Sequence, residues 1–482
     1  MDNPITIQYF EWYLPADSKH WQRLKDNVQG LVEMGVGGVW LPPCYKGTGV
    51  NDVGYGVYDL YDLGEFEQKG TVATKYGTLA ELEEAISTLH EHGIAVYGDC
   101  VINHKAGADE TELFKAVKVD PNNREKQISE PFDIKGWTKF TFPGRGNKYS
   151  EFKWNFNHFT ATDYDEISKQ SAIYRILGEN KGFSQSVDDE KGNFDYLMFA
   201  DIDYDHPDVR QEIKKWGSWY VNKLKLDGLR LDALKHIDET FIDEFVQSVR
   251  QNTDKNLYMV GEYWNGDVGK LKEYLAQVNT WLALFDVALH FNFYHASNSG
   301  DSYDMRQIFA NTLVEDKPLN VMTFVDNHDS QKGQALESYV QEWFKPLAYA
   351  LILLREDGYP CLFYGDYYGC GGDNPTPALK DKLDPLLKAR KQHAYGEQRD
   401  YFDDPNCIAF VRLGDDKHEK SGLACILSNG EGKSKYLEMG TLRAGQEWYD
   451  LTGNVTDTVM LDEKGGAEFS CAGGSVSIWV EK

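Results

Sequence analysis

The chain has 482 residues, with 77 acidic and 50 basic side chains and a formal net charge of -27. This length exceeds what one hydrophobic core usually serves, so we expect one large domain with smaller units attached. The acidic balance argues against nucleic acid and anionic membrane as partners, and no apolar run approaches the roughly 18 residues of a membrane span.

The seven cysteines are odd in number and form no CxxC pair, so neither a disulfide framework nor a zinc site is indicated. Free thiols in a reducing compartment are the simpler account. Met1 leads almost directly into an alternating apolar run at residues 5–10, without a basic stretch or an apolar signal region. We therefore expect a cytoplasmic protein, although a secreted form with its leader removed would have the same sequence.

Strands and helices alternate along most of the chain. In the first part, strands are predicted at 5–10, 36–41 and 94–101, and helices at 20–34 and 78–92. After a long interruption, helices are predicted at 208–225, 238–250 and 342–356, and strands at 228–232, 257–261, 284–287, 321–325 and 360–364. Eight strands joined by helical crossovers predict an α/β fold, a (β/α)8 TIM barrel, formed by residues 1–104 and 208–396.

Two segments depart from this alternation. Residues 105–207 are rich in Gly and Asp and contain few clear helices, so we expect an inserted subdomain after strand 3, beside the barrel. Residues 397–482 contain short apolar strands separated by turn residues, predicted at 407–412, 423–428, 448–451 and 476–480. This pattern predicts a C-terminal all-β sandwich. Two roles are compatible with it, shielding of the barrel, which we favour, and weak binding of glucan.

Polar side chains follow the predicted barrel strands where active sites of such barrels lie, at the carboxyl ends of the strands. Asp99, Asn103 and His104 follow the third strand, Arg230 and Asp232 the fourth, Glu262 and Trp264 the fifth, and His328 and Asp329 the seventh. Because each acid comes directly after a buried run, we interpret this rim as an active site and not as a solvated loop face.

The strand at 228–232 places a guanidinium beside a carboxylate. Leu229 and Leu231 alternate with Arg230 and Asp232, so the charged pair shares one face of the strand. Arg230 favours the ionised form of Asp232, and an ionised carboxylate can act as a nucleophile. Taken alone, this stretch is equally compatible with a structural ion pair.

Four segments, 99–104, 228–236, 261–264 and 324–329, resemble in order the four signature motifs of the α-amylase family of glycoside hydrolases. Further stretches at 41–47, 53–56 and 64–66 are similar to those of bacterial liquefying and cytoplasmic α-amylases. The resemblance implies an endo-acting, retaining hydrolase that cleaves internal α-1,4 bonds of starch, glycogen or maltodextrins through a covalent glycosyl-enzyme. The implied partner is thus an α-glucan polysaccharide or maltooligosaccharide, and we expect a monomer.

Two other functions are compatible with the same family. A glucanotransferase would pass the glucosyl unit to another sugar and make chains longer than its substrate. A non-catalytic relative would serve as a glucan-binding or transporter-associated subunit, and its expected mark is a missing carboxylate or a membrane span. Neither mark is seen in the sequence.

The resemblance assigns the catalytic roles by matching position. Asp232 corresponds to the nucleophile, Glu262 to the general acid/base and Asp329 to a third carboxylate that grips the sugar hydroxyls. A retaining glycosidase needs one ionised and one protonated carboxyl about 5 Å apart. The further residues that the resemblance places against substrate are Tyr55, stacked under the reacting glucose, His104, Arg230 and His328, and, on the leaving-group side, Lys235, His236 and Trp264.

The resemblance also implies one structural calcium ion that joins the inserted subdomain to the barrel. Asn103, Asp195 and Asp201 match the family's side-chain ligands, and the backbone carbonyl of His236 completes the set. Oxygen donors from distant segments suit Ca²⁺ and are unlike a zinc site.

Further metal sites of the heat-stable secreted relatives are not expected here. Two of their carboxylate positions are Thr160 and Ser184 in this chain, although Asp203 and Asp205 leave a weak second site open. A site between the barrel and the C-terminal unit would need an acid where Asn406 stands.

Overall fold

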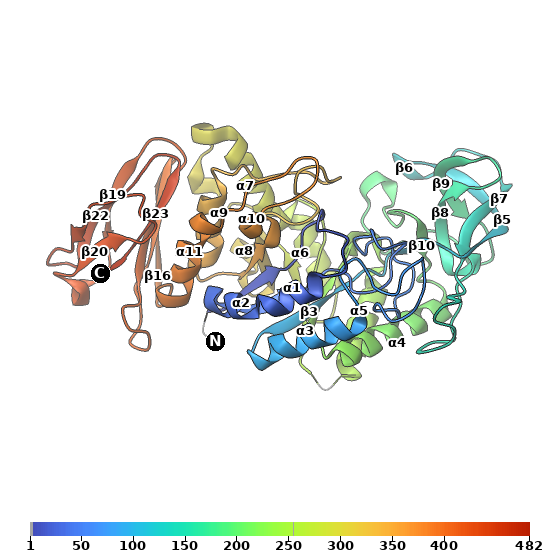
Figure 1. The fold of residues 1–482 in the computed structure, drawn as a ribbon. Helices are drawn as coiled ribbons and strands as arrows, with labels where there is room; N and C mark the ends of the chain where they lie inside the picture. Colours follow the sequence, from blue (N-terminus) through green and yellow to red (C-terminus); the bar gives the residue numbers. More distant parts are fainter. Residues whose placement is uncertain (1–2, 254) are drawn as a thin grey trace.

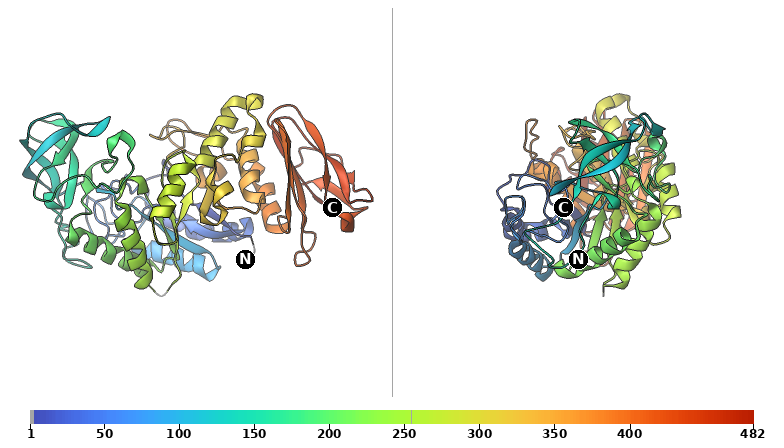
Figure 2. Two further views of the ribbon diagram at one scale, coloured as in Figure 1. Left: turned by 180° about the vertical axis from the view of Figure 1, so that it is seen from behind. Right: turned by 90° about the vertical axis from the view of Figure 1, so that its right-hand side faces the viewer.

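The structure, a computed structural model, describes residues 3–253 and 255–482. Residues 1, 2 and 254 belong to the segments predicted to form the barrel and lie outside the described residues. The inserted sheet, the barrel and the C-terminal sheets lie in a row, with the barrel in the middle (Figures 1 and 2). In the part of the chain that is described, no helix is long and apolar enough to cross a membrane.

The barrel contains all eight predicted strands, and their ends differ from the prediction by only a few residues. They close in the order β1-β15-β14-β13-β12-β11-β3-β2 within the described residues, and every neighbouring pair is parallel. Their bounds are β1 Ile5–Gln8, β2 Val36–Trp40, β3 Ala95–Cys100, β11 Gly228–Leu231, β12 Tyr258–Gly261, β13 Ala283–Phe285, β14 Val321–Phe324 and β15 Tyr359–Phe363.

Helices cover the outside of the barrel (Figure 1). The bounds are α1 His20–Asp26, α2 Val28–Met34, α3 Leu79–Glu91, α4 Pro207–Leu224, α5 Glu239–Gln251, α6 Val268–Gln277, α7 Val287–Ser299, α8 Leu313–Asp316, α9 Lys345–Leu354, α10 Tyr364–Tyr368 and α11 Lys380–Gln392. The prediction of one continuous helix over 20–34 is wrong, because the chain breaks at Asn27. The Asn27 amide donates to the hydroxyls of Tyr9 and Tyr368 at 3.1 and 2.7 Å.

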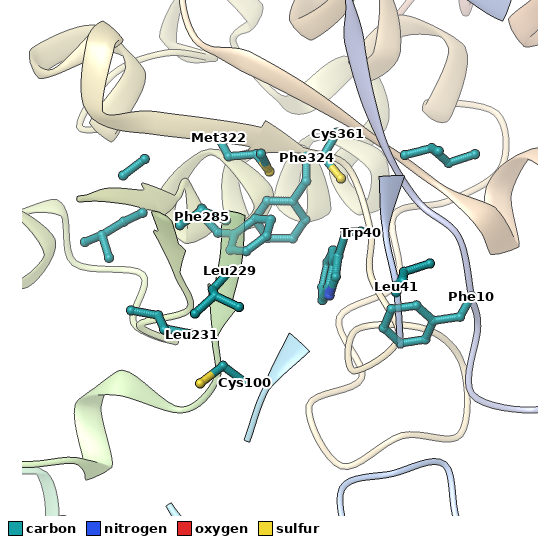
Figure 3. Packing of buried hydrophobic residues seen from close by; sticks show 14 of the residues in the cluster. Phe10, Trp40, Leu41, Cys100, Leu229, Leu231, Phe285, Met322, Phe324 and Cys361 are labelled. Carbon is teal, nitrogen blue, oxygen red and sulfur yellow. The ribbon is translucent and has the colours of Figure 1, made fainter. Parts of the chain in front are cut away.

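Large aromatic side chains fill the barrel interior (Figure 3). The Phe285 ring centroid lies 5.4 Å from that of Trp40 and 5.6 Å from that of Phe324. Side chains of this size leave no channel through the barrel. At the carboxyl end of the strands this apolar core meets polar groups: the Trp40 indole nitrogen donates to Asp99 at 3.1 Å.

The insertion after β3 is an antiparallel sheet, where the sequence predicted a subdomain without assigning its strands. Its order is β4-β10-β8-β9-β5-β6, and β7 pairs with β5. The bounds are β4 His104–Lys105, β5 Glu110–Asp120, β6 Asn123–Gln127, β7 Phe132–Lys139, β8 Phe159–Asp165, β9 Gln170–Ile176 and β10 Ala200–Ile202. Asp201 on β10 pairs with His104 on β4, so the returning chain meets the outgoing chain close to the end of β3.

The C-terminal unit consists of a six-stranded and a two-stranded antiparallel sheet, and it includes the four strands predicted there. The bounds are β16 Gln398–Asp404, β17 Cys407–Arg412, β18 Leu423–Ser428, β19 Lys433–Glu438, β20 Glu447–Asp450, β21 Val459–Met460, β22 Gly466–Cys471 and β23 Ser475–Glu481. Phe469 packs against Trp448 and Trp479 at ring centroid distances of 5.9 and 5.6 Å. All seven cysteines of the chain are buried free thiols, as predicted.

Side-chain amides join this unit to the barrel. The Asn429 amide nitrogen donates to the carbonyls of Gly300 and Tyr303 at 2.9 and 2.8 Å, and the Asn406 amide donates to the carbonyl of Asp301 at 2.6 Å. Neutral N–H donors thus bond three backbone carbonyl oxygens at this junction.

Candidate active site

One arginine organises the carboxyl groups at the end of the barrel. Arg230 on β11 is in register with Asp99 on β3, and its Nη1 lies 3.0 Å from Asp99 and 2.5 Å from Asp232. Its other terminal nitrogen, Nη2, lies 3.1 Å from Glu262, which follows β12. The predicted pairing of Arg230 with Asp232 is confirmed, and Glu262 is held close to both.

Asp329 completes the set of three predicted catalytic carboxyls. It lies in a turn after β14, in which the backbone N–H groups of Asp329 and Ser330 donate to the Asn327 side chain at 2.9 and 2.8 Å. Burial and the negative charge of Glu262 raise the pKa of Asp329 to about 7. Asp329 Oδ2 also lies 3.2 Å from Nε2 of His328, whose ring stacks on Tyr55, and the Tyr55 hydroxyl donates to Asp99.

The protonation of the site follows from its charge balance. Burial raises the pKa of Asp232, the Arg230 guanidinium opposes this rise, and the nearby Glu262 adds to it. Burial likewise raises the pKa of Asp99. Several buried carboxyls face a single guanidinium, so the cluster favours retaining a proton at neutral pH.

Asp99 and a flat aromatic surface support these carboxyls. The Tyr55 hydroxyl donates to Asp99 at 2.9 Å. The Tyr55 ring is nearly parallel to the rings of His328 and Trp12, at centroid distances of 4.9 and 6.0 Å. Tyr55 and His328 therefore lie beside the carboxyl cluster, and their predicted contact with substrate stays a prediction. Neither Trp12 nor the supporting role of Asp99 was predicted, although Asp99 begins the segment 99–104 that resembles a family motif.

His104 lies next to Tyr55 and is not bonded to the catalytic carboxyls. Its Nε2 is 2.8 Å from the Tyr55 carbonyl oxygen, and its Nδ1 is 3.4 Å from the Asn103 amide nitrogen. Burial lowers the pKa of His104 to about 4, so the ring is neutral at physiological pH. The structure gives His104 a clear part in placing Tyr55, and its predicted contact with substrate stays a prediction.

The three residues predicted for the leaving-group side lie in the loops after β11 and β12. Lys235 donates to Glu190 at 2.7 Å and to the carbonyl of Trp264 at 3.1 Å. His236 Nδ1 is 2.6 Å from the carbonyl of Phe194, and burial lowers the pKa of His236 to about 3. Glu190, from the inserted segment, was not predicted, since nothing in its local sequence marks it as a partner of Lys235.

The predicted calcium ligands come together at the base of the inserted sheet. Asp195 and Asp201 are in side-chain contact, and burial raises the pKa of both. The Asn103 amide nitrogen lies 3.4 Å from Asp201. In the described ranges, neither carboxyl forms an ion pair with Lys or Arg, although both are less than 5% exposed.

This donor set fits a hard cation, because two adjacent buried carboxyls without a basic partner are stabilised either by a shared proton or by a cation, and oxygen donors suit Ca²⁺. Within the residues described, no group of three or more His, Cys, Asp or Glu side chains could hold a metal ion by itself. The fit therefore depends on Asn103 and on backbone oxygens in addition to the two aspartates.

Asp203, which is close to Asp201 in the sequence, is paired with a lysine. The Lys181 ammonium lies 2.5 Å from Asp203 and 3.0 Å from the carbonyl of Phe159, and the lysine side chain is 6% exposed. The Thr160 hydroxyl donates to Asp201, and the Ser184 hydroxyl donates to Asp238 at 2.8 Å. Asp203 thus has a basic partner, and the number of metal sites stays a prediction.

Comparison with known proteins shows which proteins this chain resembles. The family model described as alpha amylase, catalytic domain, matches residues 17–402. An alpha-amylase of Bacillus licheniformis is 54% identical over 482 residues, covering 100% of this chain and 94% of its own length. The cytoplasmic alpha-amylase of Escherichia coli (strain K12) is 45% identical over 492 residues, covering 100% and 99%.

A solved structure shares the fold at low sequence similarity. The crystal structure of an alpha-amylase from Geobacillus thermoleovorans complexed with acarbose superposes with a TM-score of 0.67 at 17% identity, covering 100% of this chain and 98% of that chain. The family match extends over most of the chain, and two relatives exceed 40% identity along nearly their full lengths. The chain belongs to the alpha-amylase family of glycoside hydrolases.

Proposed function

We propose that the protein is an endo-acting α-amylase that hydrolyses internal α-1,4-glucosidic bonds of starch, glycogen or maltodextrins with retention of configuration. The observation that carries the proposal is the convergence of Asp232 and Glu262 on the two terminal nitrogens of Arg230. Two carboxyls attached to one guanidinium lie close enough to act on opposite sides of one glycosidic bond, as a retaining mechanism requires.

In the first step, ionised Asp232 attacks the anomeric carbon while the glycosidic C–O bond breaks. Glu262 gives its proton to the departing oxygen, and a covalent glycosyl-Asp232 ester remains. Arg230 donates to Asp232, and this contact orients the attacking carboxylate and opposes the rise in its pKa that burial causes. The leaving glucan chain passes the loops that carry Lys235 and Trp264.

In the second step, Glu262 takes a proton from water, the water oxygen attacks the anomeric carbon, and Asp232 leaves as a carboxylate. Two inversions at one carbon give net retention. Asp329 accepts hydrogen bonds from hydroxyls of the reacting glucose, and the Tyr55 ring stacks against its apolar face.

A calcium ion held by Asn103, Asp195, Asp201 and the carbonyl of His236 would supply positive charge to the buried aspartates and take no part in bond cleavage. The same segments carry His104 and Lys235, so order at the metal site supports order at the substrate site. We further propose that the protein acts in the cytoplasm, as the name of the Escherichia coli relative states for that protein.

Digestion of soluble starch, with product sizing and anomer detection, tests the proposal. We expect a rapid fall in polymer length and the release of maltooligosaccharides whose new ends are α-anomers. Release of β-anomers would contradict the retaining mechanism. Chains longer than a maltooligosaccharide substrate would instead support a glucanotransferase, which the high-identity amylase relatives do not favour. Absence of any cleavage would indicate a non-catalytic relative.

A further inference from the structure

Gln8 connects the first barrel strand to the catalytic rim. Its side-chain nitrogen Nε2 lies 3.1 Å from Nδ1 of His328, and both residues are 1% exposed. Gln8 ends β1, whereas His328 follows β14, and β15 lies between these two strands. The contact therefore spans a strand and joins residues 320 positions apart.

The second ring nitrogen of His328 points to the catalytic carboxyls. Nε2 lies 3.2 Å from Asp329 Oδ2. Their geometry is not that of a hydrogen bond, and this buried nitrogen has no hydrogen-bond partner among the described residues. An unpaired buried N–H costs free energy unless a ligand satisfies it. Nε2 is thus positioned to bond a group that arrives with the substrate.

The surroundings of His328 favour a neutral ring. Phe10, Trp40 and Tyr55 lie around it at centroid distances of 5.0, 5.8 and 4.9 Å. Burial, and then the positive charge of Arg230, lower its pKa well below the usual value. A neutral imidazole carries one N–H, and the partner of one nitrogen decides which nitrogen holds it.

We propose that Gln8 is a positioning residue that fixes the tautomer of His328, by donating its amide N–H to Nδ1 so that the ring hydrogen is on Nε2. In this tautomer, the Nε2–H donor and the Asp329 acceptor stand side by side. Such a pair matches adjacent hydroxyls of one glucose ring, one of which accepts while the other donates. In the other tautomer, a lone pair on Nε2 would face Asp329 and would repel this carboxyl group in its ionised form.

This inference rests on the proposed hydrolysis of glucans and adds a residue that acts through His328. It also predicts an unusual order of substitution effects. In Q8M, a side chain of similar length has no donor for Nδ1, and the ring hydrogen is free to move there. In Q8E, a protonated carboxyl donates to Nδ1, and an ionised one pairs with an imidazolium, so Nε2 keeps its hydrogen in both states.

The kinetic test compares Q8M and Q8E with the unchanged protein on maltoheptaose. We expect kcat/KM to fall about 10- to 100-fold in Q8M and less than about 5-fold in Q8E. If Gln8 only fills space, the order reverses, because methionine suits a buried position and an ionisable acid does not. Equal Tm values for the two variants exclude a folding defect as the cause of a difference.

Two measurements make the outcome independent of catalysis. Binding of acarbose should weaken in Q8M by a similar factor and remain close to normal in Q8E. NMR of protein labelled with ¹⁵N-histidine, with H328Q for assignment, should show an unprotonated Nδ1 on His328. A protonated Nδ1, or a Q8M variant as active as the unchanged protein, would overturn the inference. If the unchanged protein does not cleave starch, the proposed function fails, and the NMR result still decides the tautomer.

Discussion

Arg230 is the residue on which the charges of the site depend. Its guanidinium keeps its charge at all accessible pH values, and it contacts Asp99, Asp232 and Glu262 at once. One fixed cation among several buried acids permits an ionised carboxylate and a protonated one to coexist at short range. The two glycosidase roles thus arise from one local arrangement of charge.

The role of Glu262 as proton donor predicts a dependence on the leaving group. The substitution E262Q should lower kcat on maltooligosaccharides about 10³-fold, the middle of the range for general acid catalysis. It should affect the initial burst of fluoride from α-maltosyl fluoride far less, because fluoride leaves with little help from an acid and the burst precedes the second step, in which Glu262 acts as the base. The matched variant D232N should lose activity on both substrates. Equal losses on both by E262Q would remove the assignment.

The raised pKa of Asp329 predicts a pH-dependent stability. An aspartate has a pKa near 3.9 when unfolded and about 7 here, so between these values the folded state binds more protons. Stability from this group is present in acid and declines as the pH rises through 7. D329N should therefore be more stable than the unchanged protein at pH 8. The gain should be on the order of 2 kcal/mol, less than the full pKa shift implies, because the Asp329 side chain is 26% exposed and solvent screens its charge.

Thermal unfolding at pH 5 and pH 8 measures this effect. The Tm advantage of D329N should be larger at pH 8 than at pH 5. An advantage that does not change with pH would mean that Asp329 is ionised throughout this range.

The sequence predicted the site residues that stand in motifs, and it missed those that act only through distant contacts. Asp232, Glu262 and Asp329 follow strands and match family segments, so both position and type marked them. Gln8 and Glu190 are single polar residues whose partners, His328 and Lys235, lie far along the chain. No local pattern encodes such a pairing.

Among the secondary-structure elements, the strands of the barrel were easier to predict than its helices. Each strand is a short apolar run next to a turn or a polar end. Helices α6, α7 and α11 were not predicted. In α11 an internal proline, Pro385, normally argues against a helix. The inserted strands were missed because edge strands such as β6 contain hardly any apolar residues.

The start of helix α3 offers a test at this scale. Thr78 accepts a hydrogen bond from the Glu81 backbone, and Glu81 accepts one from the Thr78 backbone at 2.8 Å, forming a capping box. T78A should lower the free energy of unfolding by about 1 kcal/mol, and T78S should lower it less. Denaturant unfolding measures both variants. A T78A variant as stable as T78S would show that the cap contributes nothing.

For the whole molecule, the proposed calcium ion predicts a response to chelators. A ligand that binds only the folded state stabilises it, so EDTA should lower the Tm and added Ca²⁺ should restore it. In D195N the response should be much smaller. The matched control is D203N, whose carboxylate already pairs with Lys181, and this variant should keep the full response. An unchanged Tm in EDTA for the unchanged protein would remove the calcium proposal.

The global architecture was predictable because the alternation of strands and helices leaves few topologies. Eight strands with helical crossovers close into a barrel, and the insertion and the C-terminal strands stand out by their change of pattern. What the sequence did not reveal is how the units are fastened together. The pairing of Asp201 on β10 with His104 on β4 forms only in the folded chain. The same holds for the hydrogen bonds that the amides of Asn406 and Asn429 donate.

The two ends of the molecule are joined to the barrel by different chemistry: amide hydrogen bonds hold the C-terminal sheets, whereas the proposed calcium site lies at the inserted sheet. Asn406 and Asn429 supply hydrogen bonds that need neither an ion nor a particular pH. Sequestering calcium should thus loosen one extremity of the enzyme and leave the other rigid. Hydrogen–deuterium exchange with and without EDTA would reveal this polarity as faster exchange in β8 and β10 and unchanged exchange in β17 and β18.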